Sequence, residues 1–215
     1  MTTIRSEIAE IGVTQARLPG QQRSGDRIII LDTDHGLLIA VIDGLGHGEE
    51  AAIAAQTAAA EIIAQVPGTA IQEQVERCHA ALRQTRGVVM ALASINALTN
   101  SVSWLGVGNT MGCVLRGSPG GGFRDEALLQ RAGLVGRQLP PLRADTLPLV
   151  AGDLIILATD GIHSRFSESV RRDETSQFIA DGILASQYAG QDDAAAVVVR
   201  YLGRRAGVLA AVQAR

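Results

Sequence analysis

Four aspartates in this sequence lie at the ends of apolar, strand-like runs: Asp26, Asp43, Asp160 and Asp192. Asp43 and Asp160 each end such a run directly before a glycine. If the runs are strands of one sheet core, the four carboxylates converge at one edge of it. Carboxylate oxygens are ligands that Mg²⁺ and Mn²⁺ prefer, and they suit Zn²⁺ less well. The pattern therefore predicts a site for divalent cations.

A turn is the competing interpretation of each Asp-Gly pair. Asp and Gly are both favoured in tight turns after strands, so a single pair is more often a turn than a metal site. Two such pairs, together with two further aspartates beside strands, fit a turn explanation less well. The turn or solvent-exposed interpretation is kept for Asp32, Asp34, Asp145, Asp153 and Asp181.

Apolar runs and turn signals indicate the elements that must position these aspartates. Strands are predicted at 28–31, 37–42, 88–95, 102–107, 111–116, 127–131, 153–158 and 196–201. Residues 133–150 hold three prolines, and we expect them to be irregular. Because runs of strands stand on both sides of a helix pair, the order favours an α+β fold with largely antiparallel sheets. The helices would cover the outer faces of those sheets.

Three helices are expected. The first spans about 49–66, where apolar residues recur at helical spacing, and the third spans about 173–186. The second begins near a Thr69–Gln72 capping box. Its inward stripe is Ile71, Val75, Cys78 and Leu82.

Composition excludes several classes of protein. The chain has 215 residues, which is one domain by length, and its net charge of −3 argues against a nucleic-acid binder. All its basic residues are Arg, and the absence of Lys excludes Schiff-base catalysis and a Walker-type phosphate site. Cys78 and Cys113 form neither a zinc nor a redox pattern, which favours buried thiols in a reducing compartment. With no signal peptide and no apolar run of about 18 residues, a cytoplasmic protein with no membrane contact is expected.

Three motifs resemble a known family in their order along the chain. They are Val41-Ile42-Asp43-Gly44-Leu45-Gly46-His47-Gly48, Leu157-Ala158-Thr159-Asp160-Gly161-Ile162 and Asp192-Asp193-Ala194-Ala195-Ala196-Val197. They are similar to the core motifs of the metal-dependent PPM phosphatases, the protein phosphatase 2C type. Ser24-Gly25-Asp26 and the segment 152–161 are similar to the bacterial sporulation and stress-response branch. The resemblance covers about residues 10–202 of a single domain, 1–215.

The resemblance implies an α-β-β-α sandwich of two largely antiparallel sheets, with two Mn²⁺ or Mg²⁺ ions in a cleft between them. Asp43 would bridge both ions, and the carbonyl of Gly44 would bind one of them. Asp160 and Asp192 would bind the other ion, and Asp26 would contact the ions or their waters. Asp193 is the alternative ligand within the double aspartate. In such a site Asp26, Asp43 and Asp160 carry the catalysis, and no protein nucleophile is required.

The implied activity is hydrolysis of phosphoserine and phosphothreonine on proteins. The small size and the Asp-Gly-Leu-Gly-His-Gly form are most similar to the feedback phosphatase of the stressosome in that branch. Its partners would be phosphorylated STAS-domain proteins, and we expect a monomer. Three alternatives stay open: a sporulation-type phosphatase with another target, an inactive binding module, and an ATP-binding kinase or anti-sigma factor. The last is disfavoured because no suitable Asn precedes residue 43.

Some positions depart from the family pattern. Thr85-Arg86-Gly87 stands where larger members carry a third-metal Asp, so a third ion is not expected. Asn109 replaces the Asp of a Gly-Asp-Ser pattern and is either a turn residue or a polar neighbour of the site. A phosphate-binding arginine is not identified among Arg17, Arg23 and Arg27. His47 and His163 are either proton donors to the leaving group or loop residues.

Overall fold

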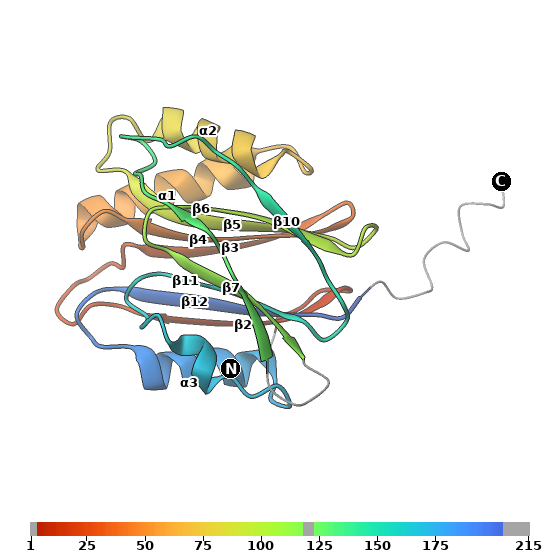
Figure 1. The fold of residues 1–215 in the computed structure, drawn as a ribbon. Helices are drawn as coiled ribbons and strands as arrows, with labels where there is room; N and C mark the ends of the chain where they lie inside the picture. Colours follow the sequence, from red (N-terminus) through yellow and green to blue (C-terminus); the bar gives the residue numbers. More distant parts are fainter. Residues whose placement is uncertain (1–3, 118–122, 204–215) are drawn as a thin grey trace.

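The computed structural model describes residues 4–117 and 123–203, and these form two stacked β-sheets with helices on both outer faces (Figure 1). The first sheet has the order β10-β6-β5-β4-β3, with β9 beside β6. Its strands are β3 (Asp26–Thr33), β4 (Gly36–Gly44), β5 (Val88–Asn96), β6 (Ser101–Val107), β9 (Gln130–Arg131) and β10 (Asp145–Pro148). All pairings are antiparallel except that of β6 with β9.

The second sheet has the order β1-β2-β12-β11-β7-β8, and all its pairings are antiparallel. Its strands are β1 (Ile4–Arg5), β2 (Ala9–Ala16), β7 (Met111–Gly117), β8 (Phe123–Ala127), β11 (Leu154–Ala158) and β12 (Ala194–Tyr201). β11 and β12 form the buried middle of this sheet, and every residue of β11 is buried. Strands covered on both faces read as nearly continuous apolar runs, which is why both were visible in the sequence.

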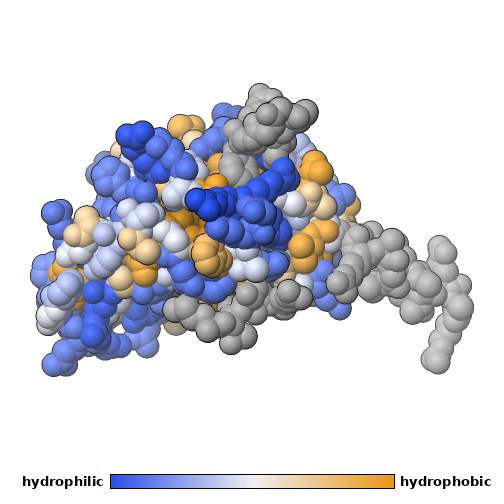
Figure 2. All heavy atoms as spheres, turned by 90° about the horizontal axis from the view of Figure 1, so that it is seen from below, coloured by the Kyte–Doolittle hydropathy of each residue, from blue (hydrophilic) through white to orange (hydrophobic). Residues whose placement is uncertain are grey.

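Helices cover both sheets. α1 (Glu49–Ala64) and α2 (Ile71–Ala81) lie on the first sheet, whereas α3 (Ser176–Gln187) and the 3₁₀ turn η1 (Phe166–Ser169) lie on the second. A central core of large side chains, among them Trp104 and Tyr201, fills the space between the sheets. The outer face that carries α3 mixes polar and apolar side chains (Figure 2). This α-β-β-α sandwich confirms the expected fold class, and in the described part of the chain no helix is long and apolar enough to cross a membrane.

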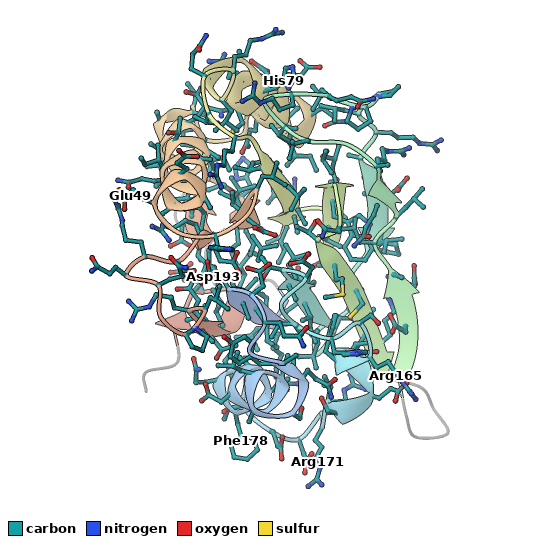
Figure 3. The ribbon with its side chains drawn as sticks, turned by 90° about the vertical axis from the view of Figure 1, so that its left-hand side faces the viewer. Glu49, His79, Arg165, Arg171, Phe178 and Asp193 are labelled. Carbon is teal, nitrogen blue, oxygen red and sulfur yellow. The ribbon has the colours of Figure 1, made fainter. Side chains whose placement is uncertain are left out.

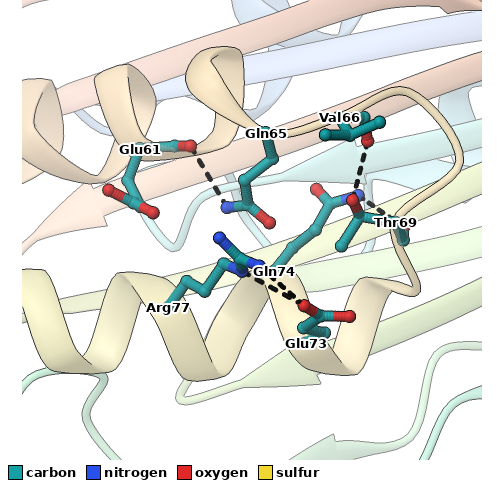
Figure 4. Close-up of polar contacts among 7 residues, drawn as sticks. All are labelled: Glu61, Gln65, Val66, Thr69, Glu73, Gln74 and Arg77. Atoms are coloured by element: carbon teal, nitrogen blue, oxygen red, sulfur yellow. Dashed lines mark hydrogen bonds and ion pairs between the residues drawn. The ribbon is translucent and has the colours of Figure 1, made fainter.

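The start of α2 differs from the predicted capping box (Figure 4). Its N-cap is Ala70, and no side chain caps the first turn. The Thr69 hydroxyl instead donates to the Val66 carbonyl at 2.7 Å, and the Thr69 carbonyl accepts from Gln74 Nε2 at 2.9 Å. Thr69 lies one residue before the N-cap, where its hydroxyl closes the turn of the α1–α2 connection. The predicted inward stripe is confirmed, since Ile71, Val75, Cys78 and Leu82 are all buried.

Several strands differ from the sequence prediction. β1 and β2 were not predicted, yet β2 pairs with β12 along its whole length. The predicted strand 127–131 is divided between the end of β8 and the two residues of β9. β10 lies within the segment expected to be irregular. These strands are held by tertiary pairing rather than by a strong local pattern.

Candidate metal centre

The predicted aspartates meet at one end of the sandwich because of strand register. Asp26 begins β3 and Asp43 lies near the end of β4, and the two are paired across these antiparallel strands. Asp160 follows β11, and Asp192 precedes β12, which is paired with β11. Figure 3 views this end of the molecule, with Asp193 between the helices that flank the two sheets.

Asp26 joins the two sheets at this end. Its side chain is buried, and its Oδ2 accepts a hydrogen bond from the Thr159 hydroxyl at 2.6 Å. The Thr159 oxygen in turn accepts the backbone N–H of Ala195 at 2.8 Å. A residue of the first sheet is therefore fixed by a hydroxyl at the end of β11 and a backbone group of β12. Sequence analysis did not single out Thr159, although it stands directly before Asp160.

The two members of the double aspartate have different surroundings. Asp193 is buried, and its two oxygens accept the backbone N–H of Leu18 at 2.8 Å and of Gly25 at 2.6 Å. It therefore holds the β2–β3 loop, which leads into Asp26. Asp192 is half-buried, and among the described residues its carboxylate accepts one hydrogen bond, from the N–H of Asp193 at 2.8 Å. Of the two carboxylates, Asp192 is the one with coordination capacity to spare.

Asp160 and Asp192 line a hollow of 350 Å³. Asn109 Nδ2 donates to Asp160 Oδ2, and Asp160 also shares a hydrogen bond with the side chain of Asp43. Asn109 is thus a polar neighbour of the site. His163 lines the same hollow, whereas His47 lies in the Gly-rich loop with its Nδ1 3.2 Å from Gln21 Nε2.

The aspartates repel one another strongly. The pKa of Asp43 is raised to about 9, first by burial and then by the charges of Asp26, Asp160, Asp192 and Asp193. The pKa of Asp26 is raised to about 7, again mainly by burial, although the hydrogen bond from Thr159 opposes the rise. Burial and the charge of Asp192 also raise the pKa of Asp160.

The arginines near the first motif do not relieve this repulsion. Within residues 4–117 and 123–203, none of the clustered aspartates has an arginine within ion-pair distance. Arg17 and Arg27 donate to backbone carbonyls, and Arg23 pairs with Glu49 at 2.6 Å. Uncompensated negative charge on hard oxygen donors fits divalent cations chemically. In the described part of the chain no three acidic, His or Cys side chains are arranged to hold one ion in common, so the ligand set stays a prediction.

The glycines after Asp43 and Asp160 have a packing reason. Gly44 is the last residue of β4, whereas Asp160 and Gly161 lie in a turn that the Ile162 N–H closes on the Thr159 carbonyl at 3.1 Å. Neither glycine has a positive φ, so the backbone conformation does not require glycine at either position. A Cβ on Gly44 would lie 2.1 Å from the carbonyl oxygen of Ala51 in α1. A Cβ on Gly161 would lie 2.0 Å from the carbonyl oxygen of Asp193. Each glycine therefore lets another segment approach the backbone beside an aspartate of the cluster.

Comparison with known proteins gives consistent matches. The profile of the family "Stage II sporulation protein E (SpoIIE)" matches residues 33–202. Phosphoserine phosphatase RsbX of Bacillus subtilis (strain 168) is 26% identical over 153 residues, 70% of this chain and 73% of that protein.

Solved structures agree with these matches. A structure described in connection with the bacterial stressosome, a modular system adapted to control secondary messenger signaling, is 28% identical with a TM-score of 0.80. The match covers 89% of this chain and 99% of that chain. The crystal structure of RsbX in complex with magnesium has a TM-score of 0.82 at 20% identity, covering 93% and 98% of the two chains, which shows a shared fold.

Proposed function

The chain belongs to the SpoIIE family, and on that premise we propose that it removes phosphate from phosphoserine or phosphothreonine of STAS-domain proteins in a stressosome. It is a serine/threonine phosphatase of the protein phosphatase 2C type. The likeness to RsbX and to a stressosome structure supports the proposed substrate class and a role in negative feedback on the stress response. In this proposal residues 1–215 form one phosphatase domain that acts as a cytoplasmic monomer.

One observation carries the proposal: Asp26 and Asp43 of the first sheet, whose pKa values burial raises, meet Asp160 and Asp192 of the second sheet at one end of the sandwich, and none has a basic partner among the described residues. Such a cluster is costly unless cations fill it, because like charges in a partly buried site repel one another. The sandwich fold itself does not require aspartates at these positions. The binding of divalent cations explains why the repulsion among them is tolerated.

We assign the binding of two Mn²⁺ or Mg²⁺ ions to Asp26, Asp43, the carbonyl of Gly44, Asp160 and Asp192. When bound, such ions neutralise the phosphate and activate a water molecule for attack on phosphorus. We assign Asp193 to positioning, because both its oxygens already accept backbone N–H groups of the β2–β3 loop.

The chain's own polar groups orient this set. Thr159 directs one oxygen of Asp26 through its hydroxyl, and Asn109 directs one oxygen of Asp160 through its amide. Outer partners of this kind fix the orientation of ligands, and their loss commonly costs about 10–100-fold in metal affinity or activity. The hollow beside Asp160 and Asp192 would admit the phosphorylated side chain.

The test is phosphate release from a phosphoserine STAS-domain protein and from p-nitrophenyl phosphate. We expect turnover with Mn²⁺ or Mg²⁺, none with EDTA, and none in Asp43→Asn. Asp32→Asn is the matched control, because Asp32 lies exposed on the same strand pair and outside the cluster. Turnover of p-nitrophenyl phosphate without turnover of the STAS protein would refute the substrate assignment alone. No turnover of either substrate by folded protein would point to a binding module.

A further inference from the structure

A second hollow opens beside the candidate metal centre and has no part in holding ions. Its volume is 470 Å³, and we call it the flank pocket: Leu45, Gly46, Arg86, Leu134 and Arg137. Leu45 directly follows Gly44, and its N–H donates to the Gly87 carbonyl at 3.1 Å. Two residues along a chain span at most about 7 Å between Cα atoms, so the pocket begins close to Asp43.

One wall of the flank pocket is a turn at residues 134–138 that is fixed on two sides. Val135 exchanges two backbone hydrogen bonds with Val88 at 3.0 and 2.9 Å. The N–H of Gly136 donates to His79 Nδ1 of α2 at 2.9 Å. The turn also lies so close to Gly87 that a Cβ there would be 2.8 Å from the Val135 carbonyl oxygen. The pocket is therefore held in shape by β5 and α2.

The side chains of the flank pocket combine apolar surface with positive charge. Leu45 is half exposed, at 50%, so it offers apolar surface to a partner at this pocket. Arg86 pairs with Glu50, so one positive charge is compensated. Arg137 donates to the Thr85 carbonyl, and within the described residues no carboxylate lies within ion-pair distance of it. The pocket thus keeps one net positive charge.

We propose that the flank pocket binds the residues next to the phosphoserine of a protein substrate, with an acidic side chain on Arg137 and an apolar one on Leu45 and Leu134. The inference rests on the proposed function and adds a sequence preference to it. A guanidinium binds a carboxylate through two parallel hydrogen bonds, and burial of an exposed leucine adds affinity. An extended peptide advances about 3.3 Å per residue, so these positions lie within a few residues of the phosphoserine.

The flank pocket would supply selectivity that the metal centre lacks. Cations held by the carboxylates would recognise a phosphate group, which every phosphoserine shares. The flanking residues are what distinguish one phosphoprotein from another. Arg137 is therefore a specificity-determining residue and does not touch the reacting atoms.

The experiment uses two phosphoserine peptides of equal length, one with Leu and Glu beside the phosphoserine and one with Ala and Lys. We measure kcat/KM for both at low salt with Mn²⁺, because salt screens exposed charges. p-Nitrophenyl phosphate serves as a substrate without flanking residues. We expect the acidic peptide to be favoured by about 5-fold or more, the size that one exposed charge contact supports.

Charge reversal at Arg137 gives a test that a folding defect cannot imitate, because it predicts a changed peptide preference and not a loss of activity. Arg137→Glu should favour the Lys peptide and keep its activity on p-nitrophenyl phosphate, and a misfolded protein cannot gain a preference. Arg171→Glu is the matched control, since Arg171 is exposed beside α3 on the far side of the molecule (Figure 3). This control should keep the wild-type preference.

The outcomes separate the two proposals. Equal kcat/KM of the wild type on both peptides, with normal turnover of p-nitrophenyl phosphate, overturns the flank pocket alone. A uniform fall of Arg137→Glu on all three substrates gives Arg137 a structural role and also overturns it. No turnover of p-nitrophenyl phosphate by the wild type overturns the proposed metal-dependent hydrolysis, and the flank pocket with it.

Discussion

Asp43 bears the largest electrostatic cost among the clustered aspartates. Its pKa is raised to about 9, first because it is buried and then because Asp26, Asp160, Asp192 and Asp193 lie near it. A carboxyl group in that state holds a proton at neutral pH when no cation is bound. Asp43 therefore lowers the stability of the metal-free protein and lies at the centre of the proposed ion site.

Asp43→Asn should separate these two roles. Phosphate release should fall by at least about 100-fold, because losing a ligand costs at least as much as losing a partner that orients one. In EDTA near pH 7 the variant should unfold at a higher temperature than the wild type, because the Asp43 carboxyl must take up a proton on folding and a neutral amide does not. The measurements are phosphate release with Mn²⁺ and thermal unfolding in EDTA.

Asp32→Asn is the control for this substitution. Asp32 is exposed on β3, and the change removes one carboxylate of the same strand pair without touching the cluster. Its activity and unfolding temperature should match those of the wild type. A loss of stability in Asp43→Asn in EDTA would contradict the charge argument.

The two cysteines are expected to be inert. Burial raises the pKa of Cys78 to about 12 and raises that of Cys113 as well. Because the thiolate is the reactive form, the native protein should not react with Ellman's reagent near pH 8. Both thiols should react after denaturation in guanidinium. Rapid labelling of the native protein would show that one of them is accessible.

Among the elements, the ends of β4 and β11 fix the positions of Asp43 and Asp160. The glycine at or just after the end of each strand lets another backbone segment pack closely against it. This segment is the start of α1 at Gly44, and Asp193, the residue before β12, at Gly161. The close contact at Gly161 places Asp193 beside Asp160, so the packing of two elements assembles the cluster. The turn interpretation therefore holds for Asp160-Gly161, where the turn also belongs to the cluster, and not for Asp43-Gly44, which lies within β4.

Gly161→Ala should therefore be costly. Its Cβ would lie 2.0 Å from the Asp193 carbonyl oxygen, and overpacking of this kind costs about 1–3 kcal/mol. Gly182→Ala is the matched control, because a Cβ there meets nothing within 4 Å and Gly182 lies inside α3. That control should stabilise the protein by about 0.5–1 kcal/mol. Urea unfolding measures both, and equal effects of the two changes would refute the packing argument.

For the molecule as a whole, the carboxyl cluster links stability to pH. Asp43 and Asp26 have raised pKa values of about 9 and about 7 in the folded state, against 3.8 as the ordinary value. The folded protein therefore holds protons that the unfolded chain has released, and its free energy of unfolding falls as pH rises. In EDTA, the urea midpoint should decrease from about pH 4 to about pH 9. Asp43→Asn should flatten this decrease, and a midpoint that rises across the same range would contradict it.

Divalent cations should reverse that loss. Ions that bind only the folded state stabilise it, by about 2.7 kcal/mol at a concentration of 100 times Kd. Adding Mn²⁺ near pH 8 should raise the unfolding temperature of the wild type and have little effect on Asp43→Asn. Differential scanning calorimetry with and without Mn²⁺ checks this. An equal rise in both proteins would place the bound ions elsewhere.

Local patterns in the sequence were enough to predict the fold class and most of its elements. Helix α2 has a clear hydrophobic period, and the buried strand β11 is a continuous apolar run. Both signals are local and do not depend on what packs around the segment. β2 and β10 have no comparable signal, because their pairing with β12 and β6 depends on contacts distant in sequence. The capping box was wrong because α2 begins at Ile71 with Ala70 as its N-cap, which leaves Thr69 outside the helix.

The sequence by itself determined that aspartates stand at strand ends, that no lysine is available, and which motifs the chain shares with a phosphatase family. The tertiary structure alone decided how the aspartates differ. It gives both oxygens of Asp193 to backbone N–H groups, leaves the half-buried Asp192 with one such contact, and brings Thr159 and Asn109 to neighbouring carboxylates. These contacts join residues up to 175 positions apart, and no local pattern encodes them. Their physical origin is the register of β3 with β4 and of β11 with β12, which only the folded sheets establish.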